Sequence, residues 1–537
     1  MSKLKFIIIT IIILITAMLR LWQLDKFPNG FTGDEAQQGY SAYSILKTGK
    51  DEWGKIFPLF PRGFGDYKPP LYTYLTIPSI ALFGLNPFAV RFPAALIGIL
   101  SVVVIYFLTK ELFKAEKIAL WSTLLLTINP WHIQLSRTAW EGGIGILTFS
   151  LGLLFYLKSG MKNLILAAIF WGLTLYSYHS WRVFVILFIA ALVLWQWKKL
   201  VILKNWIPAA ILLLLTLPIL FNLNSVLVRS SDVGIFSEQK LSGYFAEKAG
   251  SQINPVIDRT LDNKILFIGD KFLSNYLSYF SPTFYFTGER SDGTYLNFPY
   301  FPLGYSIELL FWITSIYLMV TKKIENKLIL LIWFLLAVIP ASLANGSANA
   351  NRAPTLLPLT IIFSALGVNF LIEKFKRVKY YLLPILLFSF LIFLHFYFVT
   401  LSQKPPDNLR YGYDQVFRKV LEISPKYNQI VFSKVFTEPQ IFVAFYSQMD
   451  PGEFQKASTD WLRYEKSNKL YVDQLESWNL EKYYFENINW NKKDSLRENA
   501  LIISSPEDFP ADVSSILDIK DPKGKLLYRL VPTKNAI

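Results

Sequence analysis

The sequence contains a series of apolar runs that are long enough to cross about 30 Å of hydrocarbon as helices. They lie at about residues 4–24, 90–108, 118–129, 143–157, 164–178, 183–197, 206–221, 303–320, 328–343, 355–372 and 381–400. Hydrophobic residues make up 53% of the chain and charged residues only 17%, whereas about a quarter of a soluble globular chain is charged. The chain is therefore predicted to be an α-helical polytopic membrane protein with about eleven transmembrane helices.

The connections between these runs differ in their positive charge. Lysine and arginine accumulate in every second connection, and short loops rich in these residues stay in the cytoplasm. The lysine-rich stretches lie around residues 3–5, 110–117, 158–162, 198–204, 322–327 and 374–379. This pattern predicts a multi-pass protein of the cell membrane with a cytoplasmic amino terminus. The intervening loops and the carboxyl-terminal segment are then extracytoplasmic.

A change of composition at Lys404-Pro405-Pro406 indicates a domain boundary, since proline ends a helix and the chain becomes polar at once. We predict a transmembrane domain over residues 1–400, with external loops at 25–89 and 222–302, and a small extracytoplasmic soluble α/β domain over 401–537. The elements expected in these external parts are helices at 35–46, 72–83, 261–279 and 438–447, and strands at 430–432, 501–503 and 524–530.

The formal net charge of +15 does not indicate a nucleic-acid partner, because its distribution follows the topology. The segment from Leu401 onward contains 19 Lys and Arg residues and 19 Asp and Glu residues, so it carries no net charge. The positive excess therefore lies mainly in the predicted cytoplasmic loops. The partner that composition does predict is the lipid bilayer. The absence of cysteine excludes disulfide bonds and thiolate metal sites.

The first external loop carries Gly33-Asp34-Glu35-Ala36 close to its start. Carboxylates beside an apolar bundle are costly to desolvate, and they are therefore candidates for chemistry or transport. Two interpretations of Asp34 stand side by side. It caps the helix that begins there, or it accepts a proton from a hydroxyl group that attacks an electrophilic carbon. The neighbouring Glu35 is not required by a cap.

About thirty residues later the same loop carries Asp66-Tyr67-Lys68, followed by two prolines. Proline fixes the local backbone and disfavours helix at the residue before it, so the Lys68 ammonium is held at a defined point. An anionic lipid headgroup is the expected ligand. The alternative is a lysine that reaches the phosphates of bulk lipid.

Arginine, whose planar guanidinium suits bidentate phosphate contacts, stands at four predicted outer helix ends: Arg91, Arg137, Arg182 and Arg352. The Arg137 segment also supplies His132 and Glu141, and His179 lies three residues before Arg182. None of these spacings is typical of a metal site. The sequence therefore identifies no certain cofactor, and a divalent metal is not favoured.

These segments together resemble the integral-membrane glycosyltransferases of the GT-C class, in the family of protein O-mannosyltransferases and lipid A aminoarabinose transferases. The resemblance covers about residues 1–400. The segments that carry it, in order, are 33–36, Lys68-Pro69-Pro70-Leu71, 91–95, Ser136-Arg137 with Glu141, Phe284–Arg290 followed by Pro299–Gly304, and Arg352-Ala353-Pro354. Many relatives carry Asp where Glu141 stands here.

The resemblance implies an inverting transfer of a hexose or pentose, mannose being one candidate, from a polyprenyl-phosphate donor to an extracytoplasmic protein, glycan or lipid. It implies that Asp34 is the general base, that Glu35 orients donor or acceptor, and that the donor phosphate is bound by Lys68 with Arg137, Arg182 or Arg352. Further candidate site residues are Asp66, Tyr67, Glu141, His179, Glu289 and Arg290.

A transporter or flippase of lipid-linked saccharides is the alternative function. Such a carrier is expected to place ionisable residues near the middle of the membrane and to show two related halves with broken helices. The candidate charges in this sequence instead cluster at one predicted face. That distribution favours a reaction at one side of the membrane.

Overall fold

The computed structural model describes residues 3–200, 206–225, 227, 234–237, 241–243, 263–287, 302–346, 348–405, 409–467, 469–490 and 499–533. The chain forms two compact units. Unit 1 consists of Met1–Trp22, Ala94–Ser136 and Glu141–Phe393, and unit 2 of Gln23–Pro93, Arg137–Trp140 and Leu394–Ile537. The carboxyl-terminal segment thus shares a unit with the first external loop, whereas the division into 1–400 and 401–537 stays a prediction.

Unit 1 is helical, and each predicted apolar run coincides with a helix. Its main helices are α1 (Lys3–Leu21), α4 (Pro87–Phe113, which enters from unit 2), α5 (Glu116–Ile128), α6 (Pro130–Leu135), α7 (Gly142–Lys158), α8 (Met161–Thr174), α9 (His179–Trp195), α11 (Trp206–Phe221), α15 (Lys264–Ser278), α16 (Pro282–Phe286), α17 (Glu308–Thr321), α18 (Lys327–Ala337), α19 (Ile339–Ser342), α20 (Leu357–Lys374) and α21 (Lys379–His395). The predicted helix at 261–279 is confirmed as α15.

Four described stretches are long and apolar enough to cross a membrane: Lys3–Leu21, Pro87–Phe113, Pro354–Lys374 and Lys379–Gln403. Seven shorter apolar helices accompany them. The predicted class, a helical membrane protein with several crossings, is therefore confirmed. The total of about eleven crossings and the orientation of the termini stay predictions.

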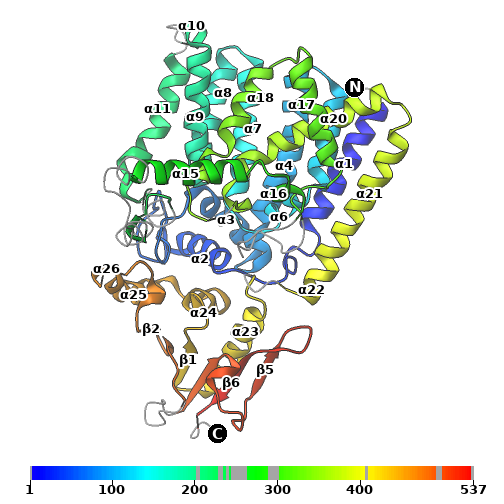
Figure 1. The fold of residues 1–537 in the computed structure, drawn as a ribbon. Helices are drawn as coiled ribbons and strands as arrows, with labels where there is room; N and C mark the ends of the chain where they lie inside the picture. The colour runs from blue at the N-terminus through cyan, green and yellow to red at the C-terminus, as the bar shows by residue number, and fades with distance from the viewer. Residues whose placement is uncertain are drawn as a thin grey trace, which may run out of the picture. The chain divides into compact units, whose positions relative to one another are not determined.

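Small residues allow the helices of unit 1 to approach closely, as is usual for helices packed in a bilayer. Gly145 faces the Trp181 ring, and Gly367 faces the Phe311 backbone. Between α7, α9 and α18, which stand side by side (Figure 1), the Phe149 ring lies 4.9 Å from the Trp333 ring and 5.1 Å from the Phe188 ring. Aromatic packing therefore forms the core of this part of the bundle.

Unit 2 combines helices with one mixed sheet. Its helices are α2 (Gly33–Thr48), α3 (Pro70–Phe83), α22 (Leu401–Gln403), α23 (Tyr413–Ile423), α24 (Pro439–Ser447), α25 (Pro451–Trp461) and α26 (Arg463–Lys466). Its strands are β1 (Gln429–Ser433), β2 (Ser477–Leu480), β3 (Tyr483–Glu486), β4 (Ala500–Ser504), β5 (Leu517–Lys520) and β6 (Leu526–Pro532). The order across the sheet is β2-β3-β1-β4-β6-β5. β1 runs parallel to β3 and β4, and the outer pairs are antiparallel.

The two faces of this sheet are covered differently. On one face, Phe417 of α23 stacks on Phe432 of β1, with ring centroids 4.8 Å apart, and on Phe442 of α24 at 5.3 Å. On the other face, Val431, Ile502, Val531 and Phe509 form a buried cluster. A sheet covered on both faces needs apolar central strands, and this is why β1 and β4 were recognisable in the sequence.

The predicted external elements are confirmed as α2, α3, α24, β1, β4 and β6. The structure adds β2, β3, β5, α23 and α25, which the sequence did not reveal. α2 packs against α24, from the carboxyl-terminal part of the chain (Figure 1). This contact brings the start of α2 next to the loop that precedes α24.

Replacing Gly367 by alanine tests the packing of α20 on α17. A Cβ atom at this position would meet the Phe311 carbonyl oxygen, so one helix must shift, and overpacking of this kind costs about 1–3 kcal/mol. G367A should lower the midpoint of thermal unfolding of the purified protein in detergent. The control is Gly269→Ala in α15, where a Cβ meets no atom within 4 Å. Equal midpoints for the two variants would contradict the packing described.

Candidate active site

The amino terminus of α2 is capped by Thr32, one residue before the helix. The Thr32 hydroxyl accepts a hydrogen bond from the Glu35 amide at 3.2 Å, and the Glu35 carboxylate accepts one from the Thr32 amide at 3.0 Å. This reciprocal arrangement is a capping box. The interpretation of Asp34 as the helix cap is therefore wrong, and the Asp34 side chain is not needed for that purpose.

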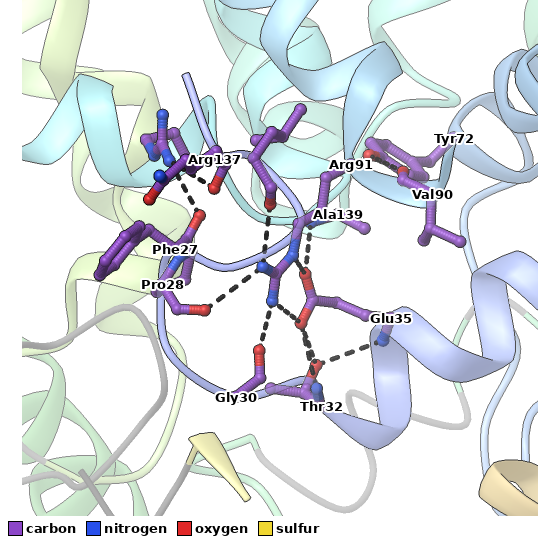
Figure 2. A network of polar contacts seen from close by, with 12 residues as sticks. Phe27, Pro28, Gly30, Thr32, Glu35, Tyr72, Val90, Arg91, Arg137 and Ala139 are labelled. Carbon is purple, nitrogen blue, oxygen red and sulfur yellow. Dashed lines mark hydrogen bonds and ion pairs between the residues drawn. The ribbon is translucent and has the colours of Figure 1, made fainter. Parts of the chain in front are cut away.

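Glu35 is buried, with 1% of its surface exposed, and forms an ion pair with the fully buried Arg91 of α4 (Figure 2). The Arg91 Nε lies 2.7 Å from one Glu35 oxygen and its Nη2 lies 3.1 Å from the other. The remaining donors of Arg91 reach the carbonyl oxygens of Leu24, Pro28 and Gly30. The Glu35 carboxylate is thus engaged inside the protein, and its contact with donor or acceptor stays a prediction.

Arg137 is also fully buried, and it donates hydrogen bonds to the carbonyl oxygens of Gln23 and Phe27 at 3.3 and 3.1 Å (Figure 2). Its guanidinium lies over the Phe398 ring, 5.3 Å from the centroid. Two residues later, the Ala139 amide donates to the Glu35 carboxylate at 3.2 Å. The segment after α6 thus holds the loop before α2 in place.

Asp34, next to Glu35 in sequence, lies in a different environment. The Lys68 Nζ lies 2.6 Å from an Asp34 carboxylate oxygen and 3.5 Å from one of Asp66. The Lys68 and Asp66 side chains are each 13% exposed, whereas that of Asp34 is 41% exposed. We call Asp34, Asp66 and Lys68 the Asp34–Lys68 site. It joins a half-buried ammonium to a carboxylate that solvent and ligands can reach, as expected from the two sequence segments.

The loop that carries Lys68 is fixed by its own backbone. The Lys68 amide donates to the Pro61 carbonyl at 2.8 Å, and the Gly63 amide donates to the Asp66 carbonyl at 2.7 Å. Tyr67 pairs with Arg62 in an isolated bridge. Lys68 therefore lies at the end of a hydrogen-bonded loop, directly before Pro69 and Pro70, where α3 begins.

The carboxyl-terminal segment holds this loop from outside. The Arg62 guanidinium lies over the Trp53 ring at 4.8 Å, donates to the Tyr464 hydroxyl at 2.9 Å and pairs with Glu465. The Val472 amide donates to the Phe64 carbonyl at 3.0 Å. The geometry around Lys68 thus depends on residues about 400 positions away.

Two carboxyl groups beside the Asp34–Lys68 site were not predicted from the sequence. Glu438, immediately before α24, has a left-handed backbone with φ of 51°, and a Cβ atom on Gly33 would meet its Oε2. The Glu438 amide donates to the Asp473 carboxylate at 3.0 Å. A side chain at position 33 would therefore displace the Glu438 carboxyl, which lies directly beside the Gly33 backbone.

Burial and the neighbouring carboxyl of Asp473 raise the pKa of Glu438 to about 8, with a further contribution from Asp34 that Lys68 opposes. Burial likewise raises the pKa of Asp473. A carboxyl that has left water favours its neutral form. The neutral form of the Glu438 carboxyl is therefore favoured at pH 7.

A third unpredicted carboxyl, Glu52, packs against the middle of α2. It is fully buried and accepts hydrogen bonds from Gln37 at 3.2 Å and Ser41 at 2.7 Å. Burial and the neighbouring Asp51 raise the pKa of Glu52 to about 8. Its Oε2 and the Asp51 Oδ2 are buried and have no hydrogen-bond partner among the described residues. A neutral Glu52 fits this environment.

The other predicted site residues belong to unit 1. Glu141 is buried directly before α7. His179 and Arg182 lie three residues apart on α9, and the Arg182 Nε donates to the Leu175 carbonyl at 3.0 Å. Arg352 lies in a 3-10 turn (Ala350–Arg352) and donates to the Asn345 carbonyl. Glu289 and Arg290 lie outside the described residues.

His132, which precedes Arg137 in the same segment, is buried in unit 1. Its Nδ1 lies 2.7 Å from the Arg20 Nη2, so this nitrogen accepts a hydrogen bond from a guanidinium. Burial and the nearby Arg20 guanidinium lower the pKa of His132. Within the described residues, no three His, Cys, Asp or Glu side chains gather in a way that would hold a metal ion.

Comparisons with known proteins agree on the fold. Residues 67–221 match the family described as dolichyl-phosphate-mannose-protein mannosyltransferase. The structure of ArnT from Cupriavidus metallidurans bound to undecaprenyl phosphate is similar at a TM-score of 0.55 and 12% identity, covering 100% of both chains. The apo form of ArnT gives 0.53 at 12% identity, with 97% of each chain covered.

A third similar structure is the Archaeoglobus fulgidus oligosaccharyltransferase, in complex with Zn and sulfate, with a TM-score of 0.50 and 17% identity over 82% of this chain and 61% of that one. No curated protein matches the sequence. The predicted resemblance is confirmed: the chain has the GT-C glycosyltransferase fold, with a small sheet domain at its carboxyl terminus.

The Glu35–Arg91 ion pair should be essential for stability. Removing one member of a buried pair leaves the other charge uncompensated, at a cost of about 3–5 kcal/mol. Glu35→Ala should therefore lower the thermal unfolding midpoint strongly or prevent accumulation of folded protein. Arg91→Lys should also destabilise, because lysine cannot make the bidentate contact.

The matched control for this pair is Lys419→Ala, which breaks the more exposed Lys419–Glu422 pair of 2.6 Å. Exposed pairs contribute about 0–1 kcal/mol, so this variant should unfold close to the wild type. Thermal unfolding of the purified proteins in detergent measures all three. An E35A protein as stable as K419A would show that the buried pair does not hold the loop.

Proposed function

We propose that this protein is an inverting glycosyltransferase of the GT-C class, which moves a sugar from a polyprenyl-phosphate donor to a hydroxyl group of an extracytoplasmic acceptor. The observation that carries the proposal is the 2.6 Å ion pair of Asp34 and Lys68. It combines a carboxylate open to ligands with an ammonium on a closed loop. A transfer of this kind requires a base for the acceptor and a cation for the leaving phosphate.

Asp34 serves as the general base in this proposal. Its carboxylate takes the proton of the acceptor hydroxyl while the acceptor oxygen forms a bond to the anomeric carbon. The bond between that carbon and the phosphate oxygen breaks on the opposite face, and its electron pair stays on the phosphate. The configuration at the anomeric carbon is thereby inverted, and the prenyl phosphate leaves as an anion.

Lys68 stabilises that anion. Negative charge develops on the leaving phosphate as the bond breaks, and a cation placed beforehand stabilises this charge without reorganisation. Because the leaving group is a phosphate, no acid is required to protonate it. The backbone hydrogen bonds of the 61–68 loop, which fix the Lys68 main chain, provide the positioning that such a role demands.

The comparisons support the donor class. The family matched by residues 67–221 is described by a dolichyl-phosphate-linked mannose donor, and one similar structure, ArnT, holds undecaprenyl phosphate. Both are polyprenyl phosphates. The proposed sugar is a hexose or a pentose, and the proposed acceptor is a protein, glycan or lipid.

The contacts refine the roles that the sequence suggested. We assign Glu35 and Arg137 to positioning, because both are buried and bound to neighbouring backbone and side-chain groups. Arg182 and Arg352 remain the proposed additional ligands of the donor phosphate. Asp66 holds Lys68 from the side opposite the substrate in this proposal.

Replacing Asp34 by asparagine should abolish sugar transfer and leave the fold intact. Asparagine preserves the shape of the side chain but cannot accept the proton, and loss of a general base typically lowers the rate about 10²–10⁴-fold. The assay is transfer from a panel of short prenyl-phosphate hexoses and pentoses by purified protein. Asp512→Asn, at an exposed position of the same unit, is the matched control. Turnover of D34N at the wild-type rate would exclude Asp34 as the base.

Replacing Lys68 by alanine should mainly weaken binding of the donor. A hydrogen bond to a charged group contributes about 1.5–3 kcal/mol, which corresponds to about a 10–100-fold increase in KM for the donor. Lys68→Arg retains the charge and should recover most of the affinity. Steady-state kinetics with varied donor and varied acceptor separate the two effects. An increase confined to the KM of the acceptor would refute the assignment.

A further inference from the structure

Glu438 is a carboxyl beside the Asp34–Lys68 site that the proposed mechanism does not use. It belongs to the carboxyl-terminal segment, yet its carboxyl reaches the backbone of Gly33, the residue directly before Asp34. The side chain is partly exposed. A residue held in the left-handed region without being glycine or asparagine is uncommon, and here that conformation places the start of α24 beside the start of α2.

The charges around this point are unbalanced. The carboxyl groups of Asp34, Asp66 and Glu438 act on one ammonium, that of Lys68. Behind Glu438 lies Asp473, whose own charge is opposed by Arg410 and Lys434. If all three carboxyl groups near Lys68 were ionised, a phosphate would meet net negative charge in addition to its own. A proton on one of them removes that obstacle.

Glu438 is the carboxyl best placed to keep its proton. Asp34 and Asp66 lie 2.6 and 3.5 Å from the Lys68 ammonium, which favours their charged forms. No ion pair with Glu438 occurs among the described residues, and Asp473 contacts its amide. The Asp473 Oδ1 is buried without a hydrogen-bond partner in the described part of the chain, so a second negative charge at Glu438 would be unfavourable.

We propose, building on the function above, that Glu438 is a further donor-binding residue of the Asp34–Lys68 site, and that its protonated carboxyl donates a hydrogen bond to an oxygen of the prenyl-phosphate sugar. Asp34 and Glu438 then divide two roles. The ionised carboxylate takes a proton from the acceptor, and the neutral carboxyl binds the donor. Environments that push two neighbouring carboxyls toward different protonation states are a recurrent way of assigning such roles.

This role predicts a dependence of donor affinity on pH. Burial and Asp473 raise the pKa of Glu438 to about 8, so the donor-binding form is present below that pH and is lost above it. Ionisation of one group makes the KM for the donor rise about tenfold per pH unit above the pKa. The value of kcat should change less than KM.

The test is the KM for a prenyl-phosphate sugar between pH 6 and 9.5, in the full-length protein. Glu438→Gln, which keeps a hydrogen-bond donor and cannot ionise, should stay within about threefold of the wild type at pH 7 and lose the alkaline increase. Glu438→Ala should raise KM about tenfold at pH 7, the effect of one lost hydrogen bond. The proposal would be overturned if E438A had the wild-type KM for the donor, or if the KM of E438Q still increased at alkaline pH.

Glu52→Gln is the matched control, because burial and Asp51 also raise the pKa of Glu52 to about 8, although its partners are on the middle of α2. This variant should retain the alkaline increase. If E52Q lost the alkaline increase of KM and E438Q kept it, the effect would belong to Glu52 and the proposal would be refuted.

Infrared difference spectroscopy separates a failure of this proposal from a failure of the proposed function. The band of a protonated carboxyl that E438Q removes should be present at pH 6 and should disappear with a midpoint near 8. A wild type that transfers sugar from none of the prenyl-phosphate donors would reject the function itself. A missing Glu438 band at pH 6 would reject the neutral carboxyl, whatever the activity.

Discussion

The buried ion pair of Glu35 and Arg91 is the interaction on which the rest of the site depends. Arg91 donates hydrogen bonds to three carbonyl oxygens of the loop before α2. The Glu35 carboxylate accepts hydrogen bonds from the Thr32 and Ala139 amides. Each group has so many partners that neither charge is left without compensation. A buried pair with this degree of hydrogen bonding fixes geometry, which is the use best attested for such pairs.

The consequence for chemistry follows from helix geometry. Consecutive residues of an α-helix point about 100° apart, so the burial of Glu35 turns Asp34 away from Arg91 and toward Lys68. One acidic residue of the Asp34-Glu35 pair becomes structural and its neighbour becomes accessible. The two adjacent acidic residues therefore occur together for two separate physical reasons.

The carboxyl-terminal segment is part of the site and more than an appended domain. It supplies Glu438 beside Gly33, stacks Tyr464 near Arg62 and pairs Val472 with Phe64. In the proposed reaction, this arrangement makes donor binding sensitive to elements at the far end of the chain. In the further proposal, the same arrangement places the neutral Glu438 carboxyl next to the Asp34–Lys68 ion pair.

The sequence by itself determined the helical membrane class, the positions of the apolar helices, the α/β character of the tail and the choice of Asp34 and Lys68 as candidate site residues. These features follow from hydropathy, from local signals such as the two prolines after Lys68, and from the resemblance to GT-C enzymes. Only the tertiary structure decided that Thr32 caps α2, that Glu35 is committed to Arg91, and that Glu438 and Asp473 lie beside the site. Those facts depend on contacts between residues up to about 400 positions apart, for which a single sequence carries no local signal.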